Sequence, residues 1–118
     1  MKRYIANNMG ITKFEKFSKE QNKISKIAKA FAHPARVAIL QQLFKLNVCV
    51  CGDLAHEIGL AQPTISQHLK ELKNIGLIKG TIEGTSVCYC IDEKVWEEFK
   101  QLFVSFFDEH DNSKIQCC

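Results

Sequence analysis

Residues 62–78 read QPTISQHLKELKNIGLI and carry the pattern of one amphipathic helix with marked ends. The apolar face of that helix is formed by Ile65, Leu69, Leu72 and Ile75, which recur at helical spacing. Pro63 suits a first helical turn, and Gly76 suits the position just after a last one. The sequence therefore predicts a helix that begins at Gln62–Pro63 and stops at Gly76.

The residues on either side of this helix predict a helix-turn-helix followed by a hairpin. Before it, Asp53 can cap a brief helix that runs to Ile58. Two helices joined by a short Gly-containing turn make a helix-turn-helix. After it, the β-rich runs 77–82 and 86–91 flank the loop 83–85 and predict a β-hairpin. The expected fold is mainly α with a β-hairpin wing, a winged helix-turn-helix.

Helical periodicity also dominates the ends of the chain. Thr12 and Glu15 have the spacing of a capping box. The apolar stripe that follows consists of Ile24, Ile27, Ala28 and Phe31. Pro34 suits the start of the next helix, which Asn47 can end. The expected buried stripe of that helix consists of Val37, Leu40, Leu43 and Phe44. Asp92 is expected to cap a last helix.

With 118 residues the chain is about one domain long, and we expect a single winged-helix DNA-binding domain over 1–118. The expected parts are a basic arm (1–11), N-terminal helices (12–33), the helix-turn-helix and wing (34–91), a dimerisation helix (92–110) and a flexible cysteine-containing tail (111–118).

The last helix is too apolar for a lone surface helix. Its stripe consists of Val95, Trp96, Phe99, Leu102, Phe103, Phe106 and Phe107. Left exposed, these side chains would form a patch of the kind that marks an interface. We therefore expect a twofold homodimer built on this helix, together with the N-terminal helix. The alternative is that the stripe packs into the chain's own core.

Composition and charge exclude several classes of protein. Apolar residues make up 46% and charged residues 25% of the chain, which is not the balance of a disordered protein. No apolar run approaches membrane-spanning length, and the first residues lack the apolar core of a secretory signal. We expect no membrane partner and a cytoplasmic location.

The net charge of +3 is divided unevenly along the chain, because residues 1–31 are basic and residues 92–111 are acidic.

The polar face of the helix at 62–75 is the candidate DNA-reading surface. The candidate DNA-binding residues are Gln62, Pro63, Thr64, Ser66, Gln67, Lys70, Lys73 and Lys79. Early positions of a recognition helix enter the major groove first. Gln67 can make a bidentate pair to adenine, whereas Lys70 and Lys73 suit phosphates of double-stranded operator DNA. His68, beside the apolar stripe, is expected to be a hydrogen-bonded packing residue.

Six cysteines form three close pairs, namely Cys49/Cys51, Cys88/Cys90 and Cys117/Cys118. In a reducing cytosol, clustered thiols indicate metal or redox chemistry rather than a disulfide framework. Residues i and i+2 share one side of an extended segment, whereas in a helix they face about 200° apart. Chelation by Cys49 and Cys51 therefore requires extended backbone. Cys88 and Cys90 share one face of a hairpin strand; they are interpreted as buried apolar residues, with a second soft-ion site or a four-thiolate zinc site as alternatives.

Three motifs in order resemble the ArsR/SmtB family of repressors. FAHPARVAIL at 31–40 is similar to the family's second-helix signature, and QPTISQHLKEL at 62–72 with GLI at 76–78 is similar to its recognition helix. The resemblance covers about residues 24–108. It implies a dimeric winged-helix repressor that leaves its operator when an inducer binds, and no enzyme. In the wing, Lys79 stands where members often carry several arginines, which implies a weaker phosphate contact.

The residues CVCGDL at 49–54 resemble the thiolate box of the family's arsenite-responsive branch, with Gly52 inserted. This resemblance implies trivalent arsenic (arsenite or a methylated arsenical, or antimonite) as inducer and no permanent cofactor. Thiolates select soft ions, and arsenic prefers three sulfurs. Leu54 and Ala55 occupy the place of the third cysteine of some members. The expected metal ligands are Cys49, Cys51, Cys117 and Cys118; two thiols suffice for a monomethylated arsenical.

Two other signals that could release a repressor of this fold from DNA remain open. A redox-switched repressor would oxidise Cys49/Cys51 or Cys117/Cys118 instead of binding an ion. A cadmium- or zinc-responsive member is the second alternative. The cadmium branch also uses N-terminal cysteines, and this sequence has none before Cys49; the zinc branch uses histidines along the last helix, where only the cluster at 108–111 carries one. A DNA-binding module without inducer would leave the paired cysteines unexplained.

Overall fold

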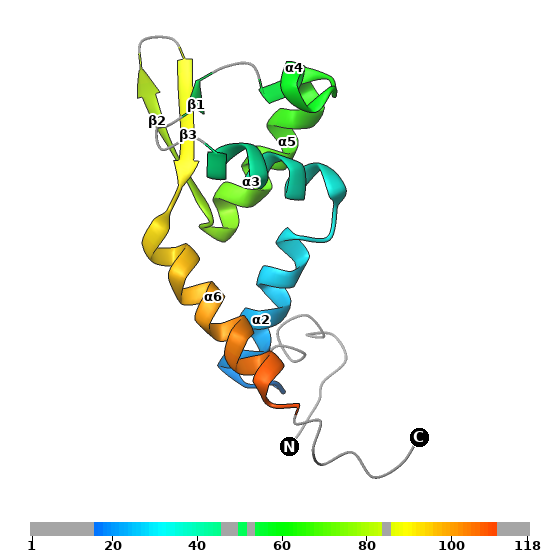
Figure 1. Cartoon of the computed structure of the whole chain (residues 1–118), viewed down its shortest axis with the longest axis vertical. Coiled ribbons are helices and arrows are strands. Elements are labelled where there is room, and N and C mark those ends of the chain that lie inside the picture. The colour runs from blue at the N-terminus through cyan, green and yellow to red at the C-terminus, as the bar shows by residue number, and fades with distance from the viewer. Residues whose placement is uncertain (1–15, 46–49, 52–53, 84–85, 111–118) are drawn as a thin grey trace, which may run out of the picture.

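A computed structural model describes residues 16–45, 50–51, 54–83 and 86–110. Within these ranges the chain forms α2 (Lys19–Ala30), α3 (Pro34–Lys45), β1 (Val50–Cys51), α4 (Leu54–Ile58), α5 (Gln62–Ile75), β2 (Ile78–Glu83), β3 (Ser86–Ile91) and α6 (Glu93–Asp108). Figure 1 shows α3, α4 and α5 gathered beside the strands, with α2 and α6 extending together from the other end. The winged helix-turn-helix expected from the sequence is confirmed.

Helix α2 begins with a capping box formed by Ser18 and Gln21. The Gln21 backbone N–H donates to Ser18 Oγ at 3.0 Å, and the Ser18 N–H donates to Gln21 Oε1 at 3.0 Å. The expected box at residues 12–15 lies outside the described residues. Ile27 is buried as expected, but Ala30 rather than Ala28 is its buried neighbour. The reason is that α2 packs against both α5 and α6.

Helix α3 starts at Pro34, as predicted. Its expected buried stripe is wrong in part, because Val37 is 39% and Phe44 47% exposed. The buried side chains are Ala35, Ile39, Leu40 and Leu43. They lie toward α4, α5 and β3, which all contact α3. The predicted end of the helix at Asn47 lies outside the described residues.

The strands form an antiparallel sheet in the order β1–β3–β2. The β2–β3 register runs from Ile78 opposite Ile91 to Glu83 opposite Ser86, so β2 continues one residue beyond its predicted end. Strand β1 pairs with β3, with Val50 opposite Tyr89 and Cys51 opposite Cys88. The wing is therefore a three-stranded sheet rather than a hairpin alone, and no sequence pattern predicted the third strand.

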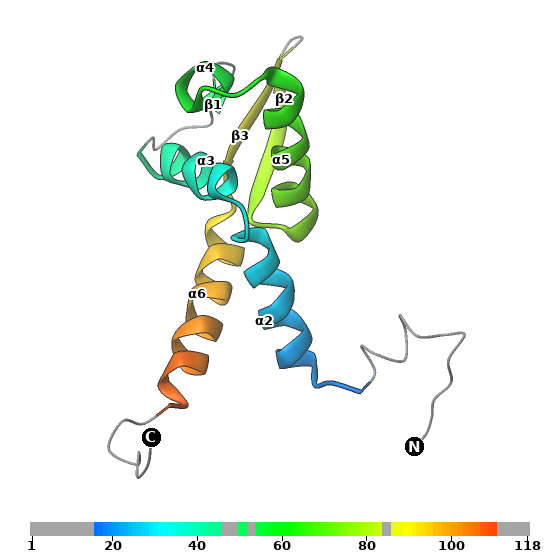
Figure 2. The ribbon, with the colours of Figure 1, turned by 90° about the vertical axis from the view of Figure 1, so that its right-hand side faces the viewer.

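Helix α6 starts where the sequence places it. Asp92 is its N-cap, and Asp92 Oδ1 accepts a hydrogen bond from the Val95 N–H at 3.2 Å. The core that joins α2, α3, α5, β2 and α6 includes Ile27, Ile39, Ile65, Leu72, Leu77 and Phe99. Figure 2 shows α2 and α6 leaving that core side by side and diverging. None of the described helices is long and apolar enough to cross a membrane.

Candidate nucleic-acid interface and thiol site

The turn between α4 and α5 fixes where α5 begins. Gly59 has φ 84°, and its N–H donates to the Ala55 carbonyl at 2.8 Å. This is the left-handed geometry that glycine adopts without steric cost. Pro63 lies in the first turn of α5 as predicted. At the other end, Gly76 has φ 97° and its N–H reaches the carbonyls of the last turn, so α5 stops where the sequence indicates.

One face of α5 is held by the core and the other is open. The buried side chains are Ile65, His68, Leu69 and Leu72. They are covered from α2, α3 and β2, which contact α5. All eight candidate DNA-binding side chains are exposed, seven of them on α5 and Lys79 on β2. Gln62 Nε2 donates to Ser66 Oγ at 3.3 Å, which links two of these residues. Figure 2 shows the hairpin running beside α5.

A cluster of His33, Arg36 and His68 ties α5 to the start of α3. Arg36 Nε donates to His68 Nδ1 at 3.2 Å, and Arg36 Nη1 donates to the Lys29 carbonyl at 3.1 Å. The rings of His33 and His68 lie 4.4 Å apart. The prediction that His68 is a hydrogen-bonded packing residue is confirmed. Burial lowers the pKa of His68, and the charges of His33 and Arg36 lower it further.

This lowered pKa makes the fold sensitive to acid. The folded state holds His68 neutral, so the unfolded chain binds more protons once the pH falls below the ordinary value of 6.5. The stabilisation is complete above that pH and is lost as the pH falls toward the pKa of the folded state. We expect His68→Gln to reduce the difference in unfolding free energy between pH 7.5 and pH 5.5, measured with urea. His110→Gln, at an exposed position, is the control, and an equal effect of both substitutions would contradict the assignment.

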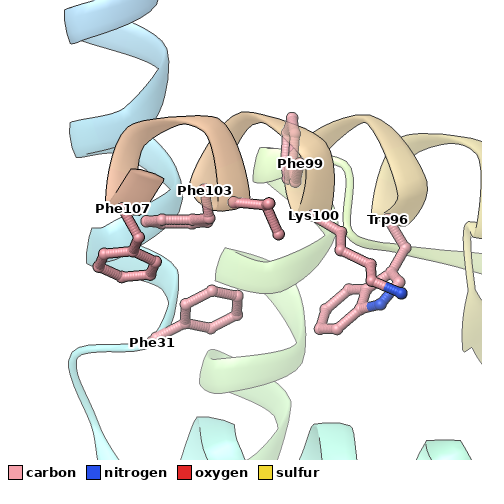
Figure 3. A pocket seen from close by; sticks show the side chains of 7 residues that line it. Phe31, Trp96, Phe99, Lys100, Phe103 and Phe107 are labelled. Carbon is pink, nitrogen blue, oxygen red and sulfur yellow. The ribbon is translucent and has the colours of Figure 1, made fainter. Parts of the chain in front are cut away.

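The exposed part of α6 forms an apolar groove of about 390 Å³ together with Phe31. Its walls are Phe31, Trp96, Phe99, Lys100, Phe103, Val104 and Phe107. Figure 3 shows the Phe31 ring below the α6 side chains, and the Phe31 and Phe103 ring centroids are 6.0 Å apart. Phe107 is 67% exposed. The apolar stripe of α6 is therefore not fully buried in the chain's own core, which was the alternative to a dimer interface.

The structure describes only part of the predicted thiol site. Cys49, Cys117 and Cys118 lie outside the described residues. The Cys51 backbone lies in β1, so the extended conformation that chelation requires is present at that residue. Cys88 is fully buried and is disulfide-bonded, whereas Cys90 is half-buried. Among the described residues, no group of three or more potential ligands gathers at one place.

Residues 33–79 match the family of bacterial regulatory proteins of the arsR family. An HTH-type transcriptional regulator of Methanocaldococcus jannaschii, MJ1325, is 41% identical over 66% of this chain and 89% of its own length. The chain belongs to the arsR family of transcriptional regulators. A homolog of the cadmium resistance transcriptional regulatory protein CadC from Staphylococcus aureus is 38% identical over 71% of this chain and 67% of its own length. This ArsR-family protein is a DNA-binding regulator and not an enzyme.

A solved structure has the same fold in a dimer. It is the homodimeric winged helix-turn-helix DNA-binding domain of a possible ArsR-family regulator from Mycobacterium bovis. The TM-score is 0.59 at 26% identity, over 81% of this chain and 95% of the other. The equivalent fold therefore occurs as a homodimer in a related protein.

Proposed function

We propose that this ArsR-family regulator is a cytoplasmic repressor that binds operator DNA as a homodimer and releases it when trivalent arsenic binds to Cys49 and Cys51. The observation that carries the proposal is the position of β1. This short extended strand contains Cys51 and lies directly before the helix-turn-helix formed by α4 and α5. A ligand that holds β1 therefore acts next to the elements that read DNA.

The DNA-binding step follows from the open face of α5. Gln62, Thr64, Ser66 and Gln67 are exposed near its beginning, the part of a recognition helix that enters the major groove first. Lys70 and Lys73 follow on the exposed side and suit phosphates. In a twofold dimer, two copies of α5 read half-sites about 34 Å apart.

The release step couples the thiols to α5 through α4. Leu54, the first residue of α4, is buried, and α4 contacts both α3 and α5. A shift of β1 on ligand binding is therefore transmitted to α4 and changes the direction in which Gln67 points. Because coupling is reciprocal, operator DNA must weaken arsenic binding by the same factor by which arsenic weakens DNA binding.

Trivalent arsenic prefers a third sulfur, for which the chain has two sources. One is the pair Cys117 and Cys118 in the tail, and the other is strand β3 with Cys88 and Cys90. A monomethylated arsenical needs only the two thiols of Cys49 and Cys51.

A titration of the DNA complex with several soft ions tests this function. The DNA-bound homodimer is titrated with arsenite, methylated arsenite, antimonite, cadmium and zinc, and release is followed by fluorescence anisotropy. We expect arsenite and its methylated form to release DNA at the lowest concentrations. Release by cadmium alone would support the second candidate function, cadmium sensing, which the similarity to the cadmium resistance regulator favours. Release by peroxide and by none of the ions would indicate the redox-switched alternative.

Two substitutions on α5 separate base reading from phosphate binding. We expect Gln67→Ala to cost about 1–3 kcal/mol of operator binding and to relax the preference for one base pair. Lys70→Ala should weaken binding to all sequences alike and reduce the slope of log affinity against log salt by about 1. Both side chains are exposed, so neither change should alter stability. Equal losses on operator and random DNA for Gln67→Ala would contradict its assignment.

A further inference from the structure

Arg36 holds helix α5 to two other helices. Its Nε donates to Nδ1 of the buried His68 at 3.2 Å, and its Nη1 donates to the Lys29 carbonyl in the last turn of α2 at 3.1 Å. Arg36 itself lies in the first turn of α3. One guanidinium therefore joins α2, α3 and α5. On α5 it binds the residue that directly follows Gln67, the side chain proposed to read a base.

Both histidines at this junction use Nδ1 as an acceptor. His68 Nδ1 accepts from Arg36, and His33 Nδ1 accepts from the Ala35 N–H at 3.0 Å, at the start of α3. A ring nitrogen accepts a hydrogen bond only while it carries no proton, and both nitrogens of an imidazolium are donors. Each contact therefore requires a neutral histidine. A proton on His68 would also place a positive charge beside Arg36, and the His33 ring centroid lies only 4.4 Å from that of His68.

The surroundings of His68 already oppose a proton. Burial lowers the pKa of His68 below its ordinary value of 6.5, and the charges of His33 and Arg36 lower it further. Helices α2 and α4 and strand β2 also pack against α5. The charged side chains that they add around α5 include Lys29, His56, Glu57 and Lys79, all of them exposed. On α5 itself, the half-buried Glu71 follows one turn after His68. The packed structure therefore holds His68 in its neutral form.

We propose that the Arg36–His68 hydrogen bond positions α5 for base reading, and that a proton on His68 opens this bond and lowers operator affinity. The inference rests on the proposed binding of operator DNA, but it is independent of arsenic, because the contact involves no cysteine. One proton passes from solvent to His68 Nδ1, the Arg36 Nε–H loses its acceptor, and the two cations separate. The buried apolar side chains still hold α5 in the core, so α5 shifts rather than unfolds.

The direction of this pH effect distinguishes it from ordinary electrostatics. Acid adds positive charge to histidines, which by itself strengthens binding to the phosphates of any DNA. Loss of the Arg36–His68 bond acts in the opposite direction and only on operator DNA, since random DNA is bound without base reading. With one linked proton, operator affinity falls by at most about tenfold per pH unit. Reciprocity requires bound operator DNA to lower the pKa of His68 in turn.

Operator affinity at pH 7.5 and at pH 5.5 tests the proposal on the full-length protein without arsenic. The probes are an operator duplex selected from a random DNA library and a random duplex of equal length, and binding is followed by fluorescence anisotropy. In His68→Gln, an amide oxygen can accept from Arg36 but takes no proton. His110→Gln, which removes an exposed histidine, is the matched control. The readout is the ratio of the affinities at the two pH values within each protein.

We expect operator affinity to fall about threefold to tenfold on acidification in the unsubstituted protein and in His110→Gln, and to change little in His68→Gln. Affinity for the random duplex should stay level or rise in all three proteins. The thiol variant Cys49→Ser/Cys51→Ser should keep the full pH response. An equal fall in His68→Gln, an equal fall on the random duplex, or no fall in the unsubstituted protein would overturn the proposal.

A direct measurement covers the case in which His68→Gln does not fold, which circular dichroism at both pH values would show. NMR of the imidazole nitrogens in the unsubstituted protein reports whether His68 Nδ1 carries a proton. We expect Nδ1 to be unprotonated at pH 7.5 and to gain its proton over the pH range in which operator affinity falls. A neutral His68 at a pH where operator affinity has already fallen would overturn the proposal. Absence of sequence-specific DNA binding at pH 7.5 would instead refute the proposed function itself.

Discussion

Replacement of Cys49 or Cys51 by serine is expected to leave operator binding intact and to abolish its release by arsenite. A serine hydroxyl is a hard donor that does not replace a thiolate toward a soft ion. Loss of either sulfur also removes the chelate, so the remaining bonds no longer form at a high effective concentration. We therefore expect the arsenite concentration for half-release to rise about 100-fold or more in each variant.

The measurement is an anisotropy titration of the variant–operator complex, with arsenic binding measured in parallel. Cys90→Ser is the matched control, because it removes a thiol from the same sheet without touching the proposed chelate. Reciprocity gives a second check, since arsenic should bind the free protein more tightly than the DNA complex by the factor by which it weakens DNA binding. A double variant, Cys49→Ser/Cys51→Ser, that arsenite still releases from DNA would eliminate the proposed site.

The parts of the fold that the sequence predicts well are those with local signals. Helix α5 has a proline in its first turn, a strict apolar stripe and Gly76 with positive φ just after its last residue. Helix α6 has a capping aspartate, and α3 has Pro34 at its start. Each signal acts over a few residues, so its physical cause is readable from the sequence.

The parts that the sequence does not predict depend on partners far along the chain. The buried face of α3 is set by α4, α5 and β3, so two of its apolar residues, Val37 and Phe44, remain partly exposed. Phe44 instead packs its ring against Trp96 of α6, with centroids 5.0 Å apart. The two-residue strand β1 has too short a pattern to be recognised. Its pairing with β3 joins residues 51 and 88, which no local rule predicts.

The candidate site also has one part that local sequence patterns predict and one part that they do not. An amphipathic helix with a known buried stripe has a known polar face, so the residues proposed for DNA contact could be named from sequence, and they are exposed. The thiol ligands could not be checked in the same way, because Cys49, Cys117 and Cys118 lie outside the described residues, and the pairing of β1 with β3 depends on a strand register that no local rule predicts.

Glutamate at two exposed positions of the α6 groove is expected to separate the homodimer and thereby remove most of the operator affinity. Val104 and Phe107 line this groove, and both side chains are largely exposed in the single chain. The double variant Val104→Glu/Phe107→Glu therefore leaves the core of the monomer in place. In the dimer, however, the introduced carboxylates would be buried without partners, which is strongly unfavourable.

The loss of operator affinity should be large because the dimer joins two weak DNA contacts. Once one α5 is bound, the second binds its half-site at a high effective concentration, and this linkage typically contributes about 10²–10⁴ in affinity. Sedimentation velocity should show monomers of the double variant, and anisotropy should show an operator affinity lower by about that factor. Ser105→Glu adds a carboxylate to the same helix, at an exposed position roughly opposite the groove, and should change neither result. A dimeric double variant with normal affinity would place the interface elsewhere, whereas a monomer that still bound the operator tightly would show that one α5 supplies most of the binding.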